Sequence, residues 1–161
     1  MCTVTFIPDG AGGYHLTSNR DEHTGRARAL PPRRHSELIY PQDATAGGSW
    51  VALKRSADAG VLLNGAFVKH RRQAKYRRSR GLVFLDILRA ESPLQEFGLL
   101  RLDGIEPFTL VLFVQEQLFE CRWDGAKKYV DELETHRPHI WSSVTLYDEA
   151  VRVEREQASD A

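Results

Sequence analysis

The sequence predicts an α+β fold whose sheet is largely antiparallel. Short segments rich in β-branched and aromatic residues, separated by glycine-containing turns, dominate the first part of the chain. Helix-like apolar periodicity is confined to a stretch near the middle, and further strand-like segments follow it. At 161 residues the chain is long enough to bury a hydrophobic core. We therefore expect one domain over residues 1–161.

Residues 2–19 are predicted to form a β-hairpin. "CTVTFIP" favours a strand, "DGAGG" a turn, and "YHLTSN" alternates. The hairpin brings residues 19–22 back to the end of the sheet where Cys2 begins. Residues 23–46 hold two adjacent prolines, several arginines and no period, so we expect an irregular surface segment there. "GGSWVALKR" and "GVLLNGAF" then predict a second antiparallel pair whose outgoing strand is buried.

Two helices are predicted after a basic segment. Residues 69–80, "KHRRQAKYRRSR", lack apolar periodicity. A helix is expected over residues 81–90, with Ser79 in its N-cap region. "SPLQ" has a capping-box pattern with Pro93 at the first helical position, which predicts a second short helix ending near Leu100.

The rest of the chain is predicted to be mainly strand. "FTLVLFV" indicates a buried strand, and "LFECRW" and "AKKYVDEL" form a hairpin around an Asp-Gly turn. "HIWSSVTLY" predicts a last strand or edge segment. Thr145 and Asp148 are expected to cap a polar C-terminal helix through "DEAVRVEREQ".

Composition excludes several function classes. Lys plus Arg and Asp plus Glu number 22 each, so no whole-chain charge selects nucleic acid or an anionic membrane as a partner. The chain has two cysteines and no apolar run approaching the ~20 residues of a membrane span, which favours a cytoplasmic location. The "HRPH" histidines lack further metal-ligand neighbours, and no cofactor fingerprint is present. The expected partner is a small molecule.

Cys2 directly follows the initiator methionine, and this position suggests catalytic chemistry. Cysteine is small enough for the methionine to be trimmed, which exposes the α-amine of Cys2. That amine has an ordinary pKa of roughly 7.7 to 8.0 and can take a proton from an adjacent nucleophile. Taken alone, Cys2 could also be interpreted as an inert buried residue.

Three further residues have suitable chemistry for a site around Cys2. Arg20 favours ionisation of a nearby thiol, and Asp21 can orient the amine through a hydrogen bond. Asn64 ends a buried strand beside a glycine, and its amide can donate to an oxyanion. Each of these residues also has a plainer interpretation, as part of a polar turn.

Seven motifs run along nearly the whole chain: "MCTVTF", "SNRDE", "AGGSWVAL", "LLNGAF", "YRRSRG", "DGIEPFTLVL" and "WSSVTLY". In these motifs the chain resembles the NRDE family, also called the transport and Golgi organization protein 2 family. Members look like N-terminal nucleophile hydrolases and are similar to choloylglycine hydrolases and penicillin V acylases. The resemblance implies an αββα sandwich of two antiparallel sheets between helical layers. Because members continue past Ala161, we expect that sandwich to be truncated at the C-terminus, with an exposed edge or a homo-oligomer.

The resemblance also implies roles for the site residues. Cys2 corresponds to the nucleophile, Asp21 to the aspartate that contacts its amine, and Asn64 to an oxyanion-hole asparagine. Choloylglycine hydrolases carry an arginine three places before that aspartate, where this chain has Ser18, so we assign its role to Arg20. The candidate substrate contacts are Asn19, Trp50 and Arg72.

Two function classes remain open. One is an N-terminal cysteine amidohydrolase that acts on a small amide or acyl compound through a thioester. The other is a non-catalytic binding or trafficking factor for lipid or haem, functions to which the wider family is linked. The basic segment 69–80 fits either a solvated loop, a nucleic-acid contact or the mouth of a site for an anionic substrate.

Overall fold

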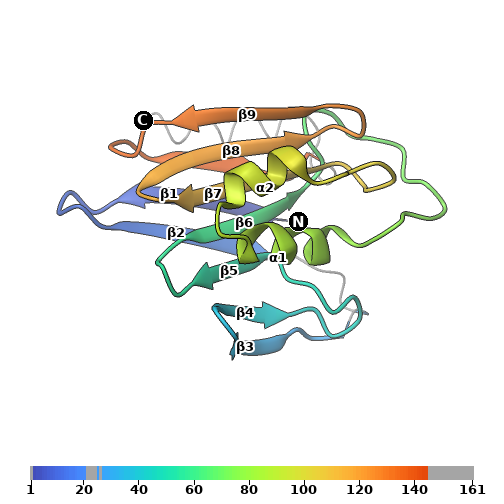
Figure 1. Ribbon diagram of the computed structural model, residues 1–161, viewed down its shortest axis with the longest axis horizontal. Coiled ribbons are helices and arrows are strands. Elements are labelled where there is room, and N and C mark those ends of the chain that lie inside the picture. The colour runs from blue at the N-terminus through green and yellow to red at the C-terminus, as the bar shows by residue number, and fades with distance from the viewer. Residues whose placement is uncertain (1, 21–24, 26, 145–161) are drawn as a thin grey trace.

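Two antiparallel sheets form the framework of the protein (Figure 1). The computed structural model describes residues 2–20, 25 and 27–144. The small sheet has the strand order β10-β1-β2, and the large sheet runs in sequence order from β3 to β9. Two helices, α1 and α2, accompany them. This architecture confirms the predicted α+β fold with antiparallel sheets. The strands are β1 (Cys2–Pro8), β2 (Tyr14–Arg20), β3 (Leu30–His35), β4 (Leu38–Gln42), β5 (Val51–Lys54), β6 (Ala59–Asn64), β7 (Phe108–Val114), β8 (Gln117–Trp123), β9 (Lys128–Leu133) and β10 (His139–Ser142), and the helices are α1 (Arg80–Arg89) and α2 (Pro93–Leu99).

The central strands of the large sheet carry buried side chains on both faces. Helices α1 and α2 cover one face, where Phe84 and Leu88 are fully buried against residues such as Leu110 (Figure 1). The small sheet covers part of the other face through Val4 and Phe6. Burying one such side chain contributes roughly 1.5–3 kcal/mol. In the described part of the chain no helices cover the small sheet, so the four-layer αββα sandwich is not confirmed.

The expectation of an irregular segment over residues 23–46 is wrong, because β3 and β4 form a hairpin there. Alternate residues of β4 point inward, and Leu38 and Tyr40 are buried in the core. Pro31 and Pro32 lie in β3, which is the edge strand of the large sheet. An edge strand tolerates proline, since one of its sides needs no N–H donor. The prolines therefore marked the edge of the sheet.

The two predicted helices are present, with one difference in their caps. The backbone N–H of Leu82 donates to the Ser79 hydroxyl, as expected for an N-cap. The Ser92 side chain makes no such bond, so the capping box was wrong. Helix α2 begins on Pro93, whose fixed φ and missing N–H suit the first turn. In the described residues neither helix has the length and apolar character to cross a membrane. Thr145, Asp148 and the predicted C-terminal helix lie outside the described residues.

A direct backbone contact fixes the start of α1 against the loop before β5. Gly48 and Gly81 face each other, and the Ser49 N–H donates to the Gly81 carbonyl at 3.4 Å. A Cβ atom on Gly81 would lie 2.8 Å from the Ser49 carbonyl oxygen. Only glycine allows this approach, and it places the first turn of α1 beside the pocket described below.

Gly81→Ala should therefore lower the free energy of unfolding by roughly 1–3 kcal/mol, because the added methyl group meets backbone that cannot rotate away. Gly98→Ala is the matched control, since Gly98 lies in α2 with open space around its Cβ position. That substitution should stabilise the protein by about 0.4–1 kcal/mol. Urea unfolding measures both effects. Equal midpoints for the two variants would contradict the close approach.

Candidate functional site

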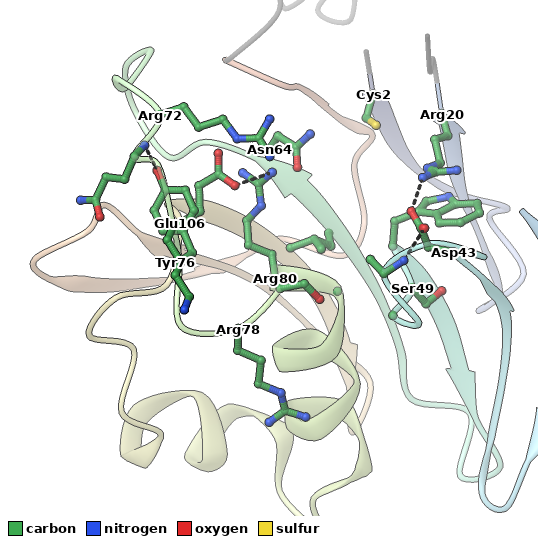
Figure 2. Close-up of a pocket in the computed structure, with 18 of the residues that line it drawn as sticks. Cys2, Arg20, Asp43, Ser49, Asn64, Arg72, Tyr76, Arg78, Arg80 and Glu106 are labelled. Carbon is green, nitrogen blue, oxygen red and sulfur yellow. Dashed lines mark hydrogen bonds and ion pairs between the residues drawn. The ribbon is translucent and has the colours of Figure 1, made fainter. Parts of the chain in front are cut away.

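A cavity of about 470 Å³ opens where β1 begins and β6 ends. Its walls come from both sheets, from the loop before β5 and from the segment that leads into α1. Figure 2 shows Cys2 and Arg20 on one side, Arg72, Arg80 and Glu106 on the other, and Asn64 between them. Residues far apart in the sequence thus share one polar cleft.

Cys2 lies at the border between the core and this cavity. It is the first residue of β1 and shares an inward face with Val4 and Phe6. Its exposed fraction is 8%, and it lines the cavity. Across the β1–β2 hairpin its register partner is Arg20. The predicted hairpin therefore brings the charged end of β2 beside Cys2.

Two contacts with described residues hold Arg20 on the cavity wall. Its Nη2 donates to Asp43 Oδ2 at 2.9 Å, and its guanidinium lies 4.0 Å from the centroid of the Trp50 ring. The other oxygen of Asp43 accepts the backbone N–H groups of Thr45 and Ala46 at 2.9 Å each. Both side chains of the ion pair are largely buried. The pair joins β2 of the small sheet to the loop that follows β4.

Asn64 occupies the last position of β6, with its side chain at the cavity. Gly65 follows with φ of 82° and donates its N–H to the Pro107 carbonyl at 3.0 Å, which ends the strand. This left-handed conformation favours glycine. The Asn-Gly pair in the sequence thus marks the point where the strand turns away and leaves the amide at the cavity.

A second buried ion pair lies on the opposite wall. Arg80 Nη2 is 3.1 Å from Glu106 Oε2, and His70 Nε2 is 3.2 Å from Glu106 Oε1. Arg80 Nη1 also donates to the Pro107 carbonyl at 3.2 Å. Burial lowers the pKa of Arg80, and the charges of Glu106 and Cys2 act in the opposite direction. A negative charge on Cys2 therefore favours the charged form of Arg80.

The cavity wall carries an excess of positive charge. Arg78 pairs with Asp86 of α1, while Arg72 and Lys75 have no ion pair among the residues that the structure describes. Both of these side chains are exposed. The cationic lining residues are Arg20, Arg72, Lys75, Arg78 and Arg80, and the anionic ones are Asp43 and Glu106. The basic segment thus borders the cavity.

The structure brings most of the predicted site residues together. Cys2, Arg20, Asn64, Trp50 and Arg72 line the cavity. Asn19 does not line it, because successive strand residues point to opposite faces and Asn19 is exposed on the other side of β2. Asp21 lies outside the described residues.

Several lining residues were missed by sequence reasoning. Asp43 fell in the segment 23–46, which was taken as irregular, and Glu106 follows a turn with no chemical pattern of its own. Ser49 also lines the cavity. Asp43 and Glu106 can be identified as site residues only from their ion pairs with Arg20 and Arg80. Among the described residues no group of three or more His, Cys, Asp and Glu side chains is placed to hold a metal ion.

The fold and the cavity define an α+β protein in which a cysteine at the start of the first strand opens on a polar, cationic cleft. The family model described as Transport and Golgi organisation 2 matches residues 1–156. The chain belongs to this family, also known as the NRDE family, which confirms the resemblance seen in the sequence. A comparison with curated proteins finds no match.

The geometry predicts that Cys2 reacts faster with iodoacetamide than Cys121. Cys121 is fully buried, and burial raises the pKa of its thiol to about 12, so it stays protonated at neutral pH. Arg20→Gln should slow alkylation of Cys2 by up to about tenfold. Loss of the positive charge raises the pKa of the thiol, and a rise of one unit lowers the thiolate population about tenfold. Mass spectrometry of the alkylated peptides gives both rates. Arg33→Gln, on exposed β3, is the control, and an equal effect there would contradict the role of Arg20.

Proposed function

We propose that the chain is an N-terminal cysteine hydrolase that cleaves a non-peptide C–N bond of a small amide or acyl compound through a thioester on Cys2. The observation that supports this proposal most directly is the position of Cys2. Its side chain borders a cavity whose walls also carry an amide, Asn64, and two buried arginines. A thiol, an amide donor and fixed positive charge in one cleft are the groups that acyl transfer needs.

The reaction begins with the α-amine that removal of Met1 exposes. This amine takes the proton of the Cys2 thiol, and the thiolate attacks the carbonyl carbon of the substrate. The Asn64 amide donates to the resulting oxyanion. Collapse of the intermediate breaks the C–N bond, and the leaving amine takes the proton back from the α-ammonium. The α-amine then takes a proton from water, and the hydroxide attacks the thioester carbonyl. The C–S bond breaks, the acid is released, and the Cys2 thiolate takes the proton back from the α-ammonium.

The buried charges have separate roles in this scheme. Arg20 and Arg80 favour the thiolate, and each is held in place by a carboxylate, Asp43 or Glu106. Asp21 orients the α-amine, as the acid does for the base of a catalytic triad.

The surplus of positive charge indicates the kind of substrate. Arg72 lies across the cavity from Cys2 (Figure 2), and Lys75 also lines the cavity. Neither has a carboxylate partner among the described residues. Positive walls raise the local concentration of anions and steer them inward. The proposed substrate therefore carries a carboxylate or a phosphate group away from its scissile bond.

The nucleophile is tested by replacing it. Intact mass should first show that the chain begins at Cys2, because a retained methionine removes the proposed base. Cys2→Ser keeps the α-amine but ionises far less near neutral pH, so turnover should fall by at least about a hundredfold. Binding should persist, since the walls are unchanged. The assay screens small amides, N-acyl amino acids and thioesters against wild type, Cys2→Ser and Cys2→Ala.

Two outcomes separate the function classes. Hydrolysis that depends on Cys2 supports the proposal. A ligand that wild type and Cys2→Ala hold equally well, with no turnover by either, contradicts it and favours the non-catalytic binding or trafficking factor.

The charge of the substrate is tested with matched double variants. Arg72→Gln with Lys75→Gln should raise KM for an anionic substrate by about two- to thirtyfold and leave kcat nearly unchanged, since two exposed charges each contribute about 0.2–1 kcal/mol. Lys69→Gln with Arg71→Gln removes the same charge from residues that do not line the cavity. Steady-state kinetics compares the two, and an equal rise in KM would show that only the total charge matters.

A further inference from the structure

Cys2 lies on the central strand of the small sheet, and both neighbouring strands make polar contacts with the large sheet. On one side β2 ends at Arg20, which pairs with Asp43. On the other side β10 leads into Ser143. The backbone N–H of Ser143 donates to the Cys2 carbonyl at 3.0 Å, and its hydroxyl donates to the Asn64 carbonyl at 2.9 Å. One residue thus bonds both the proposed nucleophile and the proposed oxyanion donor.

We propose that Ser143 is a positioning residue that fixes Cys2 relative to Asn64 at the mouth of the cavity. Its link to Cys2 lies within the small sheet, whereas its link to Asn64 crosses to the large sheet. The role in turnover rests on the proposed function, but the effect on the geometry of Cys2 does not. Nothing in the sequence pattern distinguishes Ser143 from its neighbour Ser142.

The burial of Ser143 makes the bond to Asn64 a strong constraint. Its exposed fraction is 0%, so bulk water does not compete with the carbonyl for its hydroxyl. The following carbonyl is held in the same way, because the Thr109 hydroxyl donates to Gly65 O at 2.9 Å. Two buried hydroxyls therefore fix the backbone at the end of β6. With its backbone fixed, Asn64 can move only by rotation of its side chain, which lines the cavity.

Ser142 provides the matched comparison. It lies one residue earlier and is also buried, but its hydroxyl has no hydrogen-bond partner among the described residues. It lines a separate cavity, with Leu63 and Trp141, and does not line the one that holds Cys2. Ser142→Ala therefore removes a buried hydroxyl, as Ser143→Ala does, but breaks no hydrogen bond between the two sheets.

The test compares Ser143→Ala with Ser142→Ala by two readouts. The first is the pH profile of Cys2 alkylation by iodoacetamide, which needs no substrate. Ser143→Ala should move the midpoint of this profile toward about 8.5, the value of an ordinary cysteine, while Ser142→Ala leaves it at the wild-type value. Cys121 is fully buried, so its alkylation rate reports global opening in the same experiment and separates a loss of stability from a local change at Cys2.

The second readout is the hydrolysis of N-acyl amino acids, one of the compound classes of the substrate screen. Ser143→Ala should lower kcat by at least about tenfold with KM within twofold of wild type, because small misplacements of reacting groups can cost up to about a hundredfold in rate. A shifted alkylation profile without any hydrolysis by wild type would support the positioning role and sink the proposed hydrolase. An unshifted profile with unchanged kcat, or the same shift in Ser142→Ala, would overturn the positioning role.

A second pair keeps the test decisive if Ser143→Ala does not fold. Ser143→Thr and Ser143→Val have the same shape and differ only in the hydroxyl. The Thr variant should retain the wild-type profile, and the Val variant should show the shift. Identical profiles for this pair would show that the hydroxyl bond to Asn64 has no influence on Cys2.

Discussion

The ion pair between Arg20 and Asp43 is the constraint on which the geometry of the cavity depends. Apart from this pair and the hydrogen bond from Ser143 to Asn64, the two sheets meet mainly through apolar side chains such as Val4 and Leu63, whose contacts are strong but not directional. A charge-assisted hydrogen bond fixes both a distance and a direction. Asp43 is itself held by two backbone N–H groups, so Arg20 docks on a rigid acceptor. The small sheet is therefore positioned over the large one at the end where Cys2 lies.

Burial divides the cations of the cavity into two groups. Arg20 and Arg80 are largely buried, and each has a carboxylate partner, since a buried charge without one is costly. Arg72 and Lys75 are exposed, and water stabilises their charges without a partner. The buried arginines are thus suited to hold a fixed geometry around Cys2. The exposed cations remain available to an incoming anion, which is why the two groups receive different roles in the proposed function.

Local sequence patterns predicted the parts of the site that depend on single elements. The hairpin returned Arg20 to Cys2, and the Asn-Gly pair placed Asn64 at a strand end. Strand alternation also excludes Asn19, which faces away from the cavity beside Arg20. Asp43 and Glu106 were missed because their roles come from partners far along the chain. The β3–β4 hairpin was missed because a proline-containing edge strand lacks the usual period.

The residues around Cys2 are far apart in the sequence, and this separation determines when during folding the site can form. Cys2 is at the start of the first strand, but the residue that bonds its carbonyl follows the last strand of the small sheet. Asn64 and its hydroxyl donor are likewise separated by 79 positions. Such non-local contacts form only after long loops have closed, late in folding. An N-terminal cysteine with its α-amine exposed is chemically available from the moment the methionine is removed. A site that needs Ser143 to place Cys2 would keep that thiol in its ordinary state until β10 has joined the sheet.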